Sequence, residues 1–445
     1  MEAWLPRNWT GRFPSTGNGG LDGYIDYAGL AYTTALRFAS VGANNGHNGT
    51  SGELFFNNSD VLADFAFRSI HTNVVIGKDI TQMFYGTPHN TSYYLGCSTG
   101  GREGFKSVQD FPDDFDGVVA GSPAVNFNNL ISWFAHFRNI LGNSSSPTFV
   151  TSDQWLGLIH DNILKQCDTL DGVADGIIED PNLCDYKPEE LICSPSPGAN
   201  NSDCLTAIQA TAVRQVFSPM YDLNGNLMFP REQPGSEIID FVGIVYGGET
   251  QFFGLSENWF HFVVFGPSFD TDAANLTDYT FAEQLNPFNI ATFDGNLSAF
   301  KSRGGKVLMY QGQADILISP ANTELWYNHV ADTMGLPPTD VDEVMRFFCI
   351  SGMSHCVDGL SAWEIGQIQP DNLTPETLDP ERNVLTAVVR WVEEGIAPDT
   401  IEGTKFVNDT PELGVEFRRR HCRYPLRNTF ERKGNSSDPD SWTCQ

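Results

Sequence analysis

Residues 96–102, which read GCSTGGR, limit what this chain can fold into more than any other segment. They contain the pattern Gly-x-Ser-x-Gly directly after the apolar run 93–95 and before a predicted helix over residues 103–109. A serine on a tight turn between a strand and a helix is the nucleophile elbow of α/β-hydrolases, and small neighbours permit that turn. The following helix directs its dipole and its free N–H groups at a developing oxyanion. We therefore predict that Ser98 is a nucleophile; the alternative is an ordinary exposed serine in a glycine-rich turn.

An acid and a histidine follow in the order that this class of hydrolase requires. Asp315 comes just after the strand-like run 306–310, and His355 comes just after the similar run 346–350. The loop at the carboxyl end of a strand is where the orienting acid and the base of such an enzyme belong. We expect His355 to take the proton from Ser98, and Asp315 to hold the imidazole tautomer and stabilise the imidazolium. A turn acid and an ordinary loop histidine are the alternatives.

Two cysteines stand beside these candidates. Cys97 immediately precedes Ser98, and Cys356 immediately follows the candidate histidine. A disulfide between the two cysteines would join the nucleophile loop to the histidine loop and restrain the distance between the two reacting side chains. It would close about 260 residues, which is worth at most about 5 kcal/mol in the chain-entropy model.

The pattern of residue types along the chain changes at two positions. Residues 1–126 alternate short apolar runs with glycine-rich turns, which is typical of an α/β fold. Residues 127–289 hold clustered cysteines and many aromatic residues, and the strand pattern resumes within residues 290–445. We predict that 1–126 and 290–445 form one α/β domain and that 127–289 is an inserted domain. The family resemblance described below implies that these are an α/β-hydrolase catalytic domain and its lid. The predicted strands cover residues 37–43, 93–95, 118–120, 306–310 and 346–350, and further predicted helices cover residues 60–86 and 383–394.

The charge of the chain excludes two classes of partner. Lys and Arg number 26 against 56 Asp and Glu, which gives a net charge of −30. Nucleic-acid binders and proteins that dock on anionic membranes need a basic surface. No apolar run approaches the roughly 18 residues that suggest a membrane-spanning helix. We therefore expect neither a nucleic-acid partner nor a membrane partner.

Sequons and cysteines together indicate a secreted protein. Sequons of the form Asn-x-Ser/Thr are possible glycosylation sites, and chance predicts roughly half as many as occur here. They begin at Asn8, Asn48, Asn57, Asn90, Asn143, Asn200, Asn275, Asn296, Asn372, Asn408 and Asn435. The nine cysteines lie mostly in loop-like surroundings, which favours disulfides in an oxidising compartment. Because nine is odd, one cysteine is left over; we expect it to be Cys349, whose apolar run 345–350 can pack a thiol.

These residues resemble the tannase and feruloyl esterase family. Cys97-Ser98, Asp315 and His355-Cys356 match the CS-D-HC arrangement of that family. The similarity covers nearly the whole chain and includes the segments 17–20, 44–49, 96–102 and 354–356. The resemblance implies an α/β-hydrolase domain with an inserted lid, secretion, and hydrolysis of phenolic esters by a Ser98–Asp315–His355 triad. Family members usually carry a further segment before the position of Glu2, and residues 1–6 do not read as a signal peptide, so we expect a truncated or processed chain.

The second donor of the oxyanion hole usually comes from an early loop between a strand and a helix. Residues 17–20, which read GNGG, fit this position because glycines let backbone N–H groups approach a substrate. We expect the N–H group of Gly19 or Gly20 to act together with the N–H group of Thr99. A glycine-rich turn without a catalytic role is the alternative.

A second cluster of chemistry-bearing residues occupies 168–177, which read DTLDGVADGI. Three carboxylates within eight residues repel one another unless a cation lies among them, and calcium accepts carboxylates and backbone carbonyls in flexible loops. The spacing differs from that of an EF-hand loop. The family resemblance suggests a structural calcium ion held by the side chains of Asp168, Asp171 and Asp175 and the carbonyl groups of Val173 and Ile177. A solvated acidic turn is the alternative.

The remaining cysteines also receive expected partners. Cys167 and Cys184 bracket the acidic loop, and we expect them to pair and preorganise it. We further expect the pairs Cys193–Cys204 and Cys422–Cys444.

The predicted reaction is a two-step acyl transfer on a phenolic ester. The expected substrates include phenolic esters that are linked to polysaccharide. A lid of about 160 residues without a long processing loop favours the feruloyl-esterase branch of the family. A tannase acting on galloyl esters is one alternative, and a non-catalytic secreted glycoprotein that binds calcium or polysaccharide is another. Aromatic residues of the lid could stack on the phenolic ring, but core packing is the stronger expectation for most of them. The aromatic residues considered in the lid are Trp133, Phe134, Trp155, Phe252, Phe253, Trp259 and Phe260.

Overall fold

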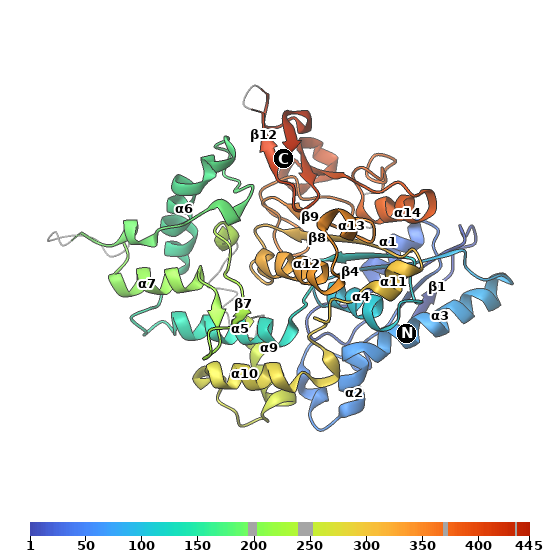
Figure 1. Cartoon of the computed structure of the whole chain (residues 1–445), viewed down its shortest axis with the longest axis horizontal. Helices are drawn as coiled ribbons and strands as arrows, with labels where there is room; N and C mark the ends of the chain where they lie inside the picture. The colour runs from blue at the N-terminus through green and yellow to red at the C-terminus, as the bar shows by residue number, and fades with distance from the viewer. Residues whose placement is uncertain (195–202, 239–251, 368–372, 432–433) are drawn as a thin grey trace.

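The structure is a computed structural model that describes residues 1–194, 203–238, 252–367, 373–431 and 434–445. A sheet of seven strands runs through the larger part of the molecule, with helices around it (Figure 1). A largely helical part lies beside the sheet, on the left of that view. This arrangement is the α/β fold with an insertion that the sequence predicts.

The central sheet has the strand order β1-β3-β2-β4-β5-β8-β9. Within it β1 runs antiparallel to β3, and every other neighbouring pair is parallel. Parallel strands end at a common edge, and in open α/β sheets ligands bind outside those carboxyl ends. The strands are β1 (Glu2–Trp4), β2 (Arg12–Thr16), β3 (Ser40–Gly42), β4 (Thr91–Cys97), β5 (Gly117–Gly121), β8 (Lys306–Gly312) and β9 (Met345–Ile350).

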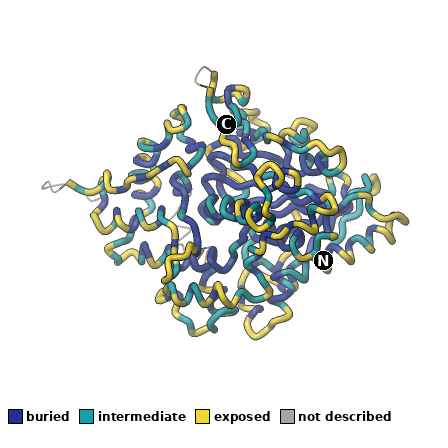
Figure 2. The backbone as a smooth tube through the Cα atoms, viewed as in Figure 1, coloured by how far each residue is buried: buried dark blue, intermediate teal, exposed yellow. Residues whose placement is uncertain are grey.

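Side chains of the central strands alternate between two hydrophobic cores, as the pleat of a strand requires. In β5, Val118 and Ala120 pack into one core, whereas Val119 packs into the other. Because both faces are covered, the central strands read in the sequence as continuous apolar runs. Buried chain accordingly fills the centre of this part of the molecule (Figure 2). The first core is covered by α3 (Ser69–Tyr85), α4 (Thr99–Asp110) and α12 (Pro320–Met334), and the second by α1 (Tyr27–Ala35) and α14 (Val384–Glu394).

The chain between β5 and β8 forms the largely helical part. In the portion of this segment that the structure describes, no strand joins the seven-stranded sheet. Its elements include the helices α5 (Phe127–Leu141), α6 (His160–Cys167), α7 (Ala207–Val216), α9 (Phe252–Trp259) and α10 (Leu276–Leu285) and the short paired strands β6 (Met220–Tyr221) and β7 (Leu227–Phe229).

The core of this helical part continues into the residues that precede it. Phe127 and Trp259 stack edge to face with a centroid distance of 5.0 Å, and Phe65 of the N-terminal region lies 6.3 Å from Phe127. One buried cluster therefore contains side chains from both sides of residue 127, and the boundaries at 126 and 290 stay predictions. Core packing holds for most of the aromatic residues named above: Trp133, Phe134, Trp155, Trp259 and Phe260 are buried, while the side chains of Phe252 and Phe253 lie outside the described part.

Most predicted elements are present, with changed ends. The predicted strand 37–43 is wrong over its first half: Arg37 has φ 66° after the end of α1, and only Ser40–Gly42 pairs as β3. The long helix predicted over 60–86 comprises α2 (Ser59–Ala63), a π-helical stretch and α3, and it ends at Gly86 with φ 72°. No helix in the described residues is long and apolar enough to cross a membrane.

The C-terminal region adds two hairpins that the sequence did not predict. The first pairs β10 (Thr400–Phe406) with β11 (Val415–Cys422), and the second pairs β12 (Asn428–Phe430) with β13 (Trp442–Cys444). Both lie near the C-terminus at the top of Figure 1.

Four disulfides are present, and all join predicted partners: Cys97–Cys356, Cys167–Cys184, Cys193–Cys204 and Cys422–Cys444. Cys349 is free, also as predicted. Among the sequons, Asn200 and Asn372 lie outside the described residues, and the nine other asparagines are exposed.

Candidate active site

Ser98 sits on a sharp turn at the carboxyl end of β4. That strand ends one residue before Ser98, and α4 begins one residue after it. The serine has φ 64° and ψ −124°, a strained conformation typical of a nucleophile elbow. A Cβ atom on Gly96 would lie 2.8 Å from the backbone of Gly100, and one on Gly100 would lie 2.9 Å from the backbone oxygen of Asn18. The glycines of the motif are therefore required by the packing of the turn.

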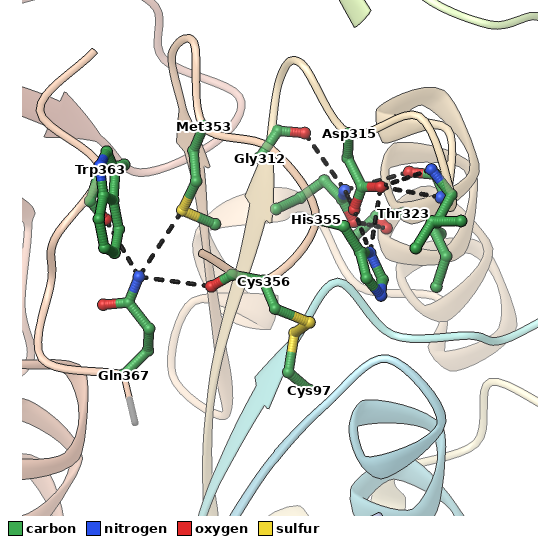
Figure 3. Close-up of a disulfide and its surroundings, with 12 residues drawn as sticks. Cys97, Gly312, Asp315, Thr323, Met353, His355, Cys356, Trp363 and Gln367 are labelled. Carbon is green, nitrogen blue, oxygen red and sulfur yellow. Dashed lines mark hydrogen bonds and ion pairs between the residues drawn. A yellow bond between two sulfur atoms is a disulfide. The ribbon is translucent and has the colours of Figure 1, made fainter. Parts of the chain in front are cut away.

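His355 contacts Asp315 in the arrangement that the sequence predicts. Its Nδ1 atom lies 2.9 Å and 3.1 Å from the two carboxylate oxygens of Asp315 (Figure 3). The carboxylate is fully buried, and the backbone N–H groups of Leu317 and Ile318 also donate to it, each at 2.9 Å. Since Nδ1 faces the carboxylate, Nε2 is the nitrogen left to serve a nucleophile.

Gln311 is a further residue of this site that sequence reasoning missed. Its Nε2 atom donates to Asp315 at 2.8 Å, and its Oε1 atom accepts from the hydroxyl group of Thr323 at 2.7 Å. Gln311 is fully buried at the end of β8. It therefore restrains the Oδ2 atom of Asp315, which also faces the imidazole, and no pattern in the sequence singled it out.

The disulfide Cys97–Cys356 brings the nucleophile and histidine loops together. The Cα atoms of the two cysteines lie 6.0 Å apart, and Ser98 and His355 line the same cavity. Figure 3 shows the disulfide next to the imidazole, with Gln367 donating to the carbonyl group of Cys356 at 3.3 Å. The histidine loop is thus fixed by a covalent bond on one side and by a hydrogen bond on the other.

The cavity has a volume of about 590 Å³, within the range of small-molecule sites. Its lining includes Ser98, Thr99, His355, Gly19 and Gly20, which are the predicted catalytic and oxyanion residues apart from the buried Asp315. Most of the other lining side chains are apolar. They include Leu21, Phe127, Leu130, Ile131, Phe134, Leu255, Leu317 and Ile318. A largely apolar cavity that includes Ser98 in its lining can accept an aromatic acyl group.

The loop 17–20 lies against the start of α4. The hydroxyl group of Thr99 donates to the carbonyl oxygen of Gly20 at 2.8 Å, and Gly20 has φ 46°. Gly19 and Gly20 both line the cavity beside Ser98. The structure thus places the three predicted oxyanion residues around the nucleophile, and their role in catalysis stays a prediction.

Two polar side chains of the cavity were not predicted. Burial raises the pKa of Asp22, which a hydrogen bond from Tyr24 opposes, and burial together with the nearby carboxylate raises the pKa of Tyr24 to about 12. Asp22 also lies close to the oxyanion loop, since a Cβ atom on Gly19 would be 3.3 Å from its carboxylate. These groups can hydrogen-bond a polar substituent of a ligand.

The acidic loop 168–177 lies in the helical part and is built from turns in which backbone N–H groups bind the carboxylates. Val173 donates to Asp171 at 2.9 Å and Ile177 donates to Asp175 at 3.2 Å. Asp175 also pairs with the buried Arg419 at 2.7 Å. In the described residues no group of three or more acidic, histidine or cysteine side chains already has a metal-binding arrangement.

Part of this loop nevertheless fits a cation. The Oδ2 atom of Asp171 is buried and has no hydrogen-bond partner. Burial, together with the nearby carboxylates of Glu179 and Asp175, raises the pKa of Asp171 to about 7. Burial and Asp175 likewise raise the pKa of Asp168. A bound calcium ion would supply the missing partner and favour the ionised carboxylates.

Comparison with known proteins identifies the family. The family model described as "Tannase and feruloyl esterase" matches residues 1–445. The chain belongs to the tannase and feruloyl esterase family. A relative from Aspergillus terreus named "Probable feruloyl esterase B-2" is 54% identical over 445 residues, which are 100% of this chain and 82% of the relative. "Probable feruloyl esterase B-1" from Aspergillus flavus is 52% identical and covers 100% of this chain and 83% of the relative.

Solved structures of the same family agree with the fold. Feruloyl esterase B from Aspergillus oryzae superposes with a TM-score of 0.94 at 48% identity, covering 100% of this chain and 86% of that chain. The tannin acyl hydrolase of Aspergillus niger superposes with a TM-score of 0.78 at 22% identity, covering 100% and 82%. Family membership and the α/β fold are therefore confirmed, and the family is one of carboxylic ester hydrolases.

Proposed function

We propose that this protein is a serine esterase that cleaves feruloyl and related cinnamoyl esters of plant cell-wall material. The single observation that carries the proposal is that Ser98 and His355 line one largely apolar cavity, where the disulfide Cys97–Cys356 links their loops and His355 is hydrogen-bonded to Asp315. The relatives named feruloyl esterase B, at more than 50% identity over the full chain, support the choice of acyl group.

The chain's own residues supply each step of the reaction. The Ser98 hydroxyl attacks the ester carbonyl carbon, and Nε2 of His355 takes its proton. The N–H group of Thr99 and that of Gly19 or Gly20 stabilise the tetrahedral oxyanion. The bond to the alcohol then breaks, and the alcohol leaves with the proton from His355. Water repeats the sequence on the acyl-serine, which releases the phenolic acid and returns a proton to Ser98.

The apolar lining of the cavity favours a substrate whose acyl group is a methoxylated cinnamoyl group. Phe127, Leu130 and Phe134 lie on one helix, α5, and present apolar surface to the cavity. A methoxyl group loses little when it leaves water for such a surface, whereas a hydroxyl group there needs a hydrogen-bond partner.

A tannase-like preference for galloyl esters is the second candidate. The observation that favours it is the presence of Asp22 and Tyr24 in the same cavity, because a ring with three hydroxyl groups needs such partners. The likeness to the tannin acyl hydrolase, at 22% identity, supports the shared fold and no particular substrate.

Two accompanying properties belong to the proposal. A calcium ion held by residues of the loop 168–177 would stabilise the helical part, with no role in the chemical steps. Secretion is supported by the four disulfides, which persist in oxidising compartments, and by the exposure of the nine sequon asparagines in the described residues.

The test is hydrolysis of methyl ferulate and methyl gallate by the purified protein, measured side by side as kcat/KM. We expect faster cleavage of ferulate by at least tenfold. Faster cleavage of gallate would move the protein to the tannase branch. Folded protein that cleaves neither ester would contradict both candidates and favour the non-catalytic glycoprotein.

A further inference from the structure

Glu103 lies on the first turns of α4, just beneath the nucleophile turn. Its side chain is almost completely enclosed, with 3% of the residue exposed. Burial raises the pKa of this carboxyl group, and the neighbouring Arg102 lowers it. A buried acid is costly unless its oxygens are hydrogen-bonded, so its partners show what it stabilises.

The partners of Glu103 come from three other segments. Its Oε2 atom accepts from the backbone N–H group of Asn18 at 3.1 Å and lies 3.1 Å from the hydroxyl group of Tyr94. Its Oε1 atom accepts from the side-chain amide of Asn45 at 2.8 Å. Asn18 is the second residue of the loop 17–20, so the carboxyl group binds the backbone of the predicted oxyanion loop directly.

The backbone of the loop 17–20 packs closely against the backbone of α4, with the hydroxyl group of Tyr94 beside the contact. A Cβ atom on Gly17 would lie 2.7 Å from the Cα atom of Gly100, and one on Gly100 would lie 2.9 Å from the oxygen of Asn18. Tyr94 bridges the same contact, because its hydroxyl group donates to the carbonyl oxygen of Gly100 at 2.7 Å. Because backbone packs against backbone at this contact, the hydrogen bonds of Glu103 and Tyr94 set the position of the loop.

Asn45 and Asn18 also link the loop to its neighbours. The side chain of Asn18 donates to the carbonyl oxygen of Ala43 at 3.1 Å and to that of Tyr24. The Oδ1 atom of Asn45 is buried without a partner. Glu103 is thus the acceptor at the centre of a small network that joins β4, α4 and the two loops beside the cavity.

We propose that Glu103 is a positioning residue of the oxyanion hole, which holds the loop 17–20 at the distance from α4 at which its N–H groups and that of Thr99 converge on one oxygen. The proposal rests on the proposed function, in which Ser98 forms a tetrahedral oxyanion. Displacement of the loop would weaken the transition state more than the bound substrate, because only the transition state carries the full charge on that oxygen.

Replacing Glu103 by glutamine tests the acceptor with little change of shape. If the new amide nitrogen takes the place of Oε2, it faces the N–H group of Asn18, and two donors meet. If the amide is reversed, its nitrogen faces the side-chain nitrogen of Asn45, which must then turn its unpartnered oxygen inward. We therefore expect Glu103→Gln to lower kcat tenfold to a hundredfold and to change KM by less than threefold.

A second readout does not depend on the substrate class. A fluorophosphonate probe reacts when the Ser98 oxygen attacks phosphorus, fluoride leaves and His355 takes the proton. In the pentacoordinate transition state the phosphoryl oxygen carries negative charge and occupies the oxyanion hole. We expect Glu103→Gln to slow labelling of Ser98 by about the same factor as kcat. Tyr94→Phe, which removes a single hydroxyl group from the network, provides a second variant with an expected threefold or larger fall.

Glu393→Gln is the matched control. Glu393 also accepts from several donors, namely Arg12, Thr91 and Tyr93, but it lies on α14 and contributes nothing to the cavity. We expect it to lower the melting temperature without lowering kcat. Unchanged kcat and labelling rate in folded Glu103→Gln, or in Tyr94→Phe if the first variant does not fold, would overturn the proposal. Failure to cleave ferulate alongside normal labelling of the wild type would count only against the proposed substrate.

Discussion

Cys97 and Cys356 lie 259 positions apart in the chain, yet a disulfide joins them with their Cα atoms 6.0 Å apart. One directly precedes Ser98, the proposed nucleophile, and the other directly follows His355, the proposed base. The bond therefore connects the two loops whose separation decides whether a proton can pass between serine and imidazole. Its placement suggests that it serves the geometry of the site as well as stability.

Replacing both of these cysteines by serine should lower kcat/KM by at least tenfold, because small displacements of reacting groups are costly. The melting temperature should also fall, since the crosslink is worth at most about 5 kcal/mol in the chain-entropy model. Steady-state kinetics on methyl ferulate and a thermal melt measure the two effects. The double variant Cys193→Ser/Cys204→Ser is the control, because its disulfide joins residues 11 positions apart in the helical part. Equal kcat/KM in the two folded double variants would show that the first disulfide has no specific effect on the site.

Gln311→Leu should lower kcat about tenfold, because the carboxylate of Asp315 loses a hydrogen bond of 2.8 Å and one of its restraints. A hydrogen bond to a charged group contributes about 1.5–3 kcal/mol. A tenfold fall in rate corresponds to about 1.4 kcal/mol, close to the lower end of that range. KM should stay nearly constant, since Gln311 does not line the cavity. Gln109→Leu on α4 removes a similar side chain away from the pair and should leave kcat unchanged. A raised KM with an unchanged kcat would be inconsistent with this role.

His421 should make the protein less stable as the pH falls below neutrality. Burial lowers the pKa of His421 from 6.5 to about 4; its Nε2 atom lies 3.0 Å from the carbonyl oxygen of Ala362, and its Nδ1 atom is buried without a partner. Between these two pH values the unfolded chain binds a proton that the folded protein does not. The neutral His421 therefore contributes about 3 kcal/mol to the free energy of unfolding. This contribution is fully present above pH 6.5 and is lost as the pH falls to 4. Urea unfolding of wild type and His421→Gln at pH 7.5 and pH 4.5 should show a smaller decrease for the variant. Equal decreases would mean that His421 does not titrate in this way.

Removal of calcium should lower the melting temperature by several degrees and leave kcat at 25 °C unchanged. A ligand that binds only the folded state at a hundred times its Kd stabilises by about 2.7 kcal/mol. The comparison is a thermal melt in calcium against one in EGTA. Asp171→Asn should abolish the difference, whereas Asp222→Asn, in an exposed turn, should preserve it. The same melting temperature with and without calcium would leave the loop 168–177 as an acidic turn.

How much of this could be read from the sequence depends on how local each signal is. Ser98, Asp315 and His355 each follow a buried apolar strand, and that context predicts their places at one edge of the sheet. Gln311 and Glu103 gave no such signal, because each acts only through partners that the fold brings close. Nothing local distinguishes them from other polar residues.

The C-terminal hairpins escaped prediction for a related reason. Residues 415–422 read VEFRRRHC, a charged segment without apolar alternation. In the structure Arg419 is buried, pairs with Glu179 at 2.9 Å, and stacks over Trp442 at 4.2 Å. Charge that would ordinarily indicate an exposed segment is here neutralised by acids far away in the chain.

The most direct test of the account is hydrolysis of methyl ferulate by wild type and Ser98→Ala, compared at equal concentrations of folded protein. The serine lies outside the hydrophobic cores, so the variant should keep the wild-type circular dichroism spectrum and melting temperature. We predict turnover by the wild type and a rate at least about a thousandfold lower for the variant, since loss of a catalytic nucleophile costs about this much or more. A folded wild type without activity, or a variant that retains more than about a tenth of the rate, would contradict the assignment of Ser98 as the nucleophile.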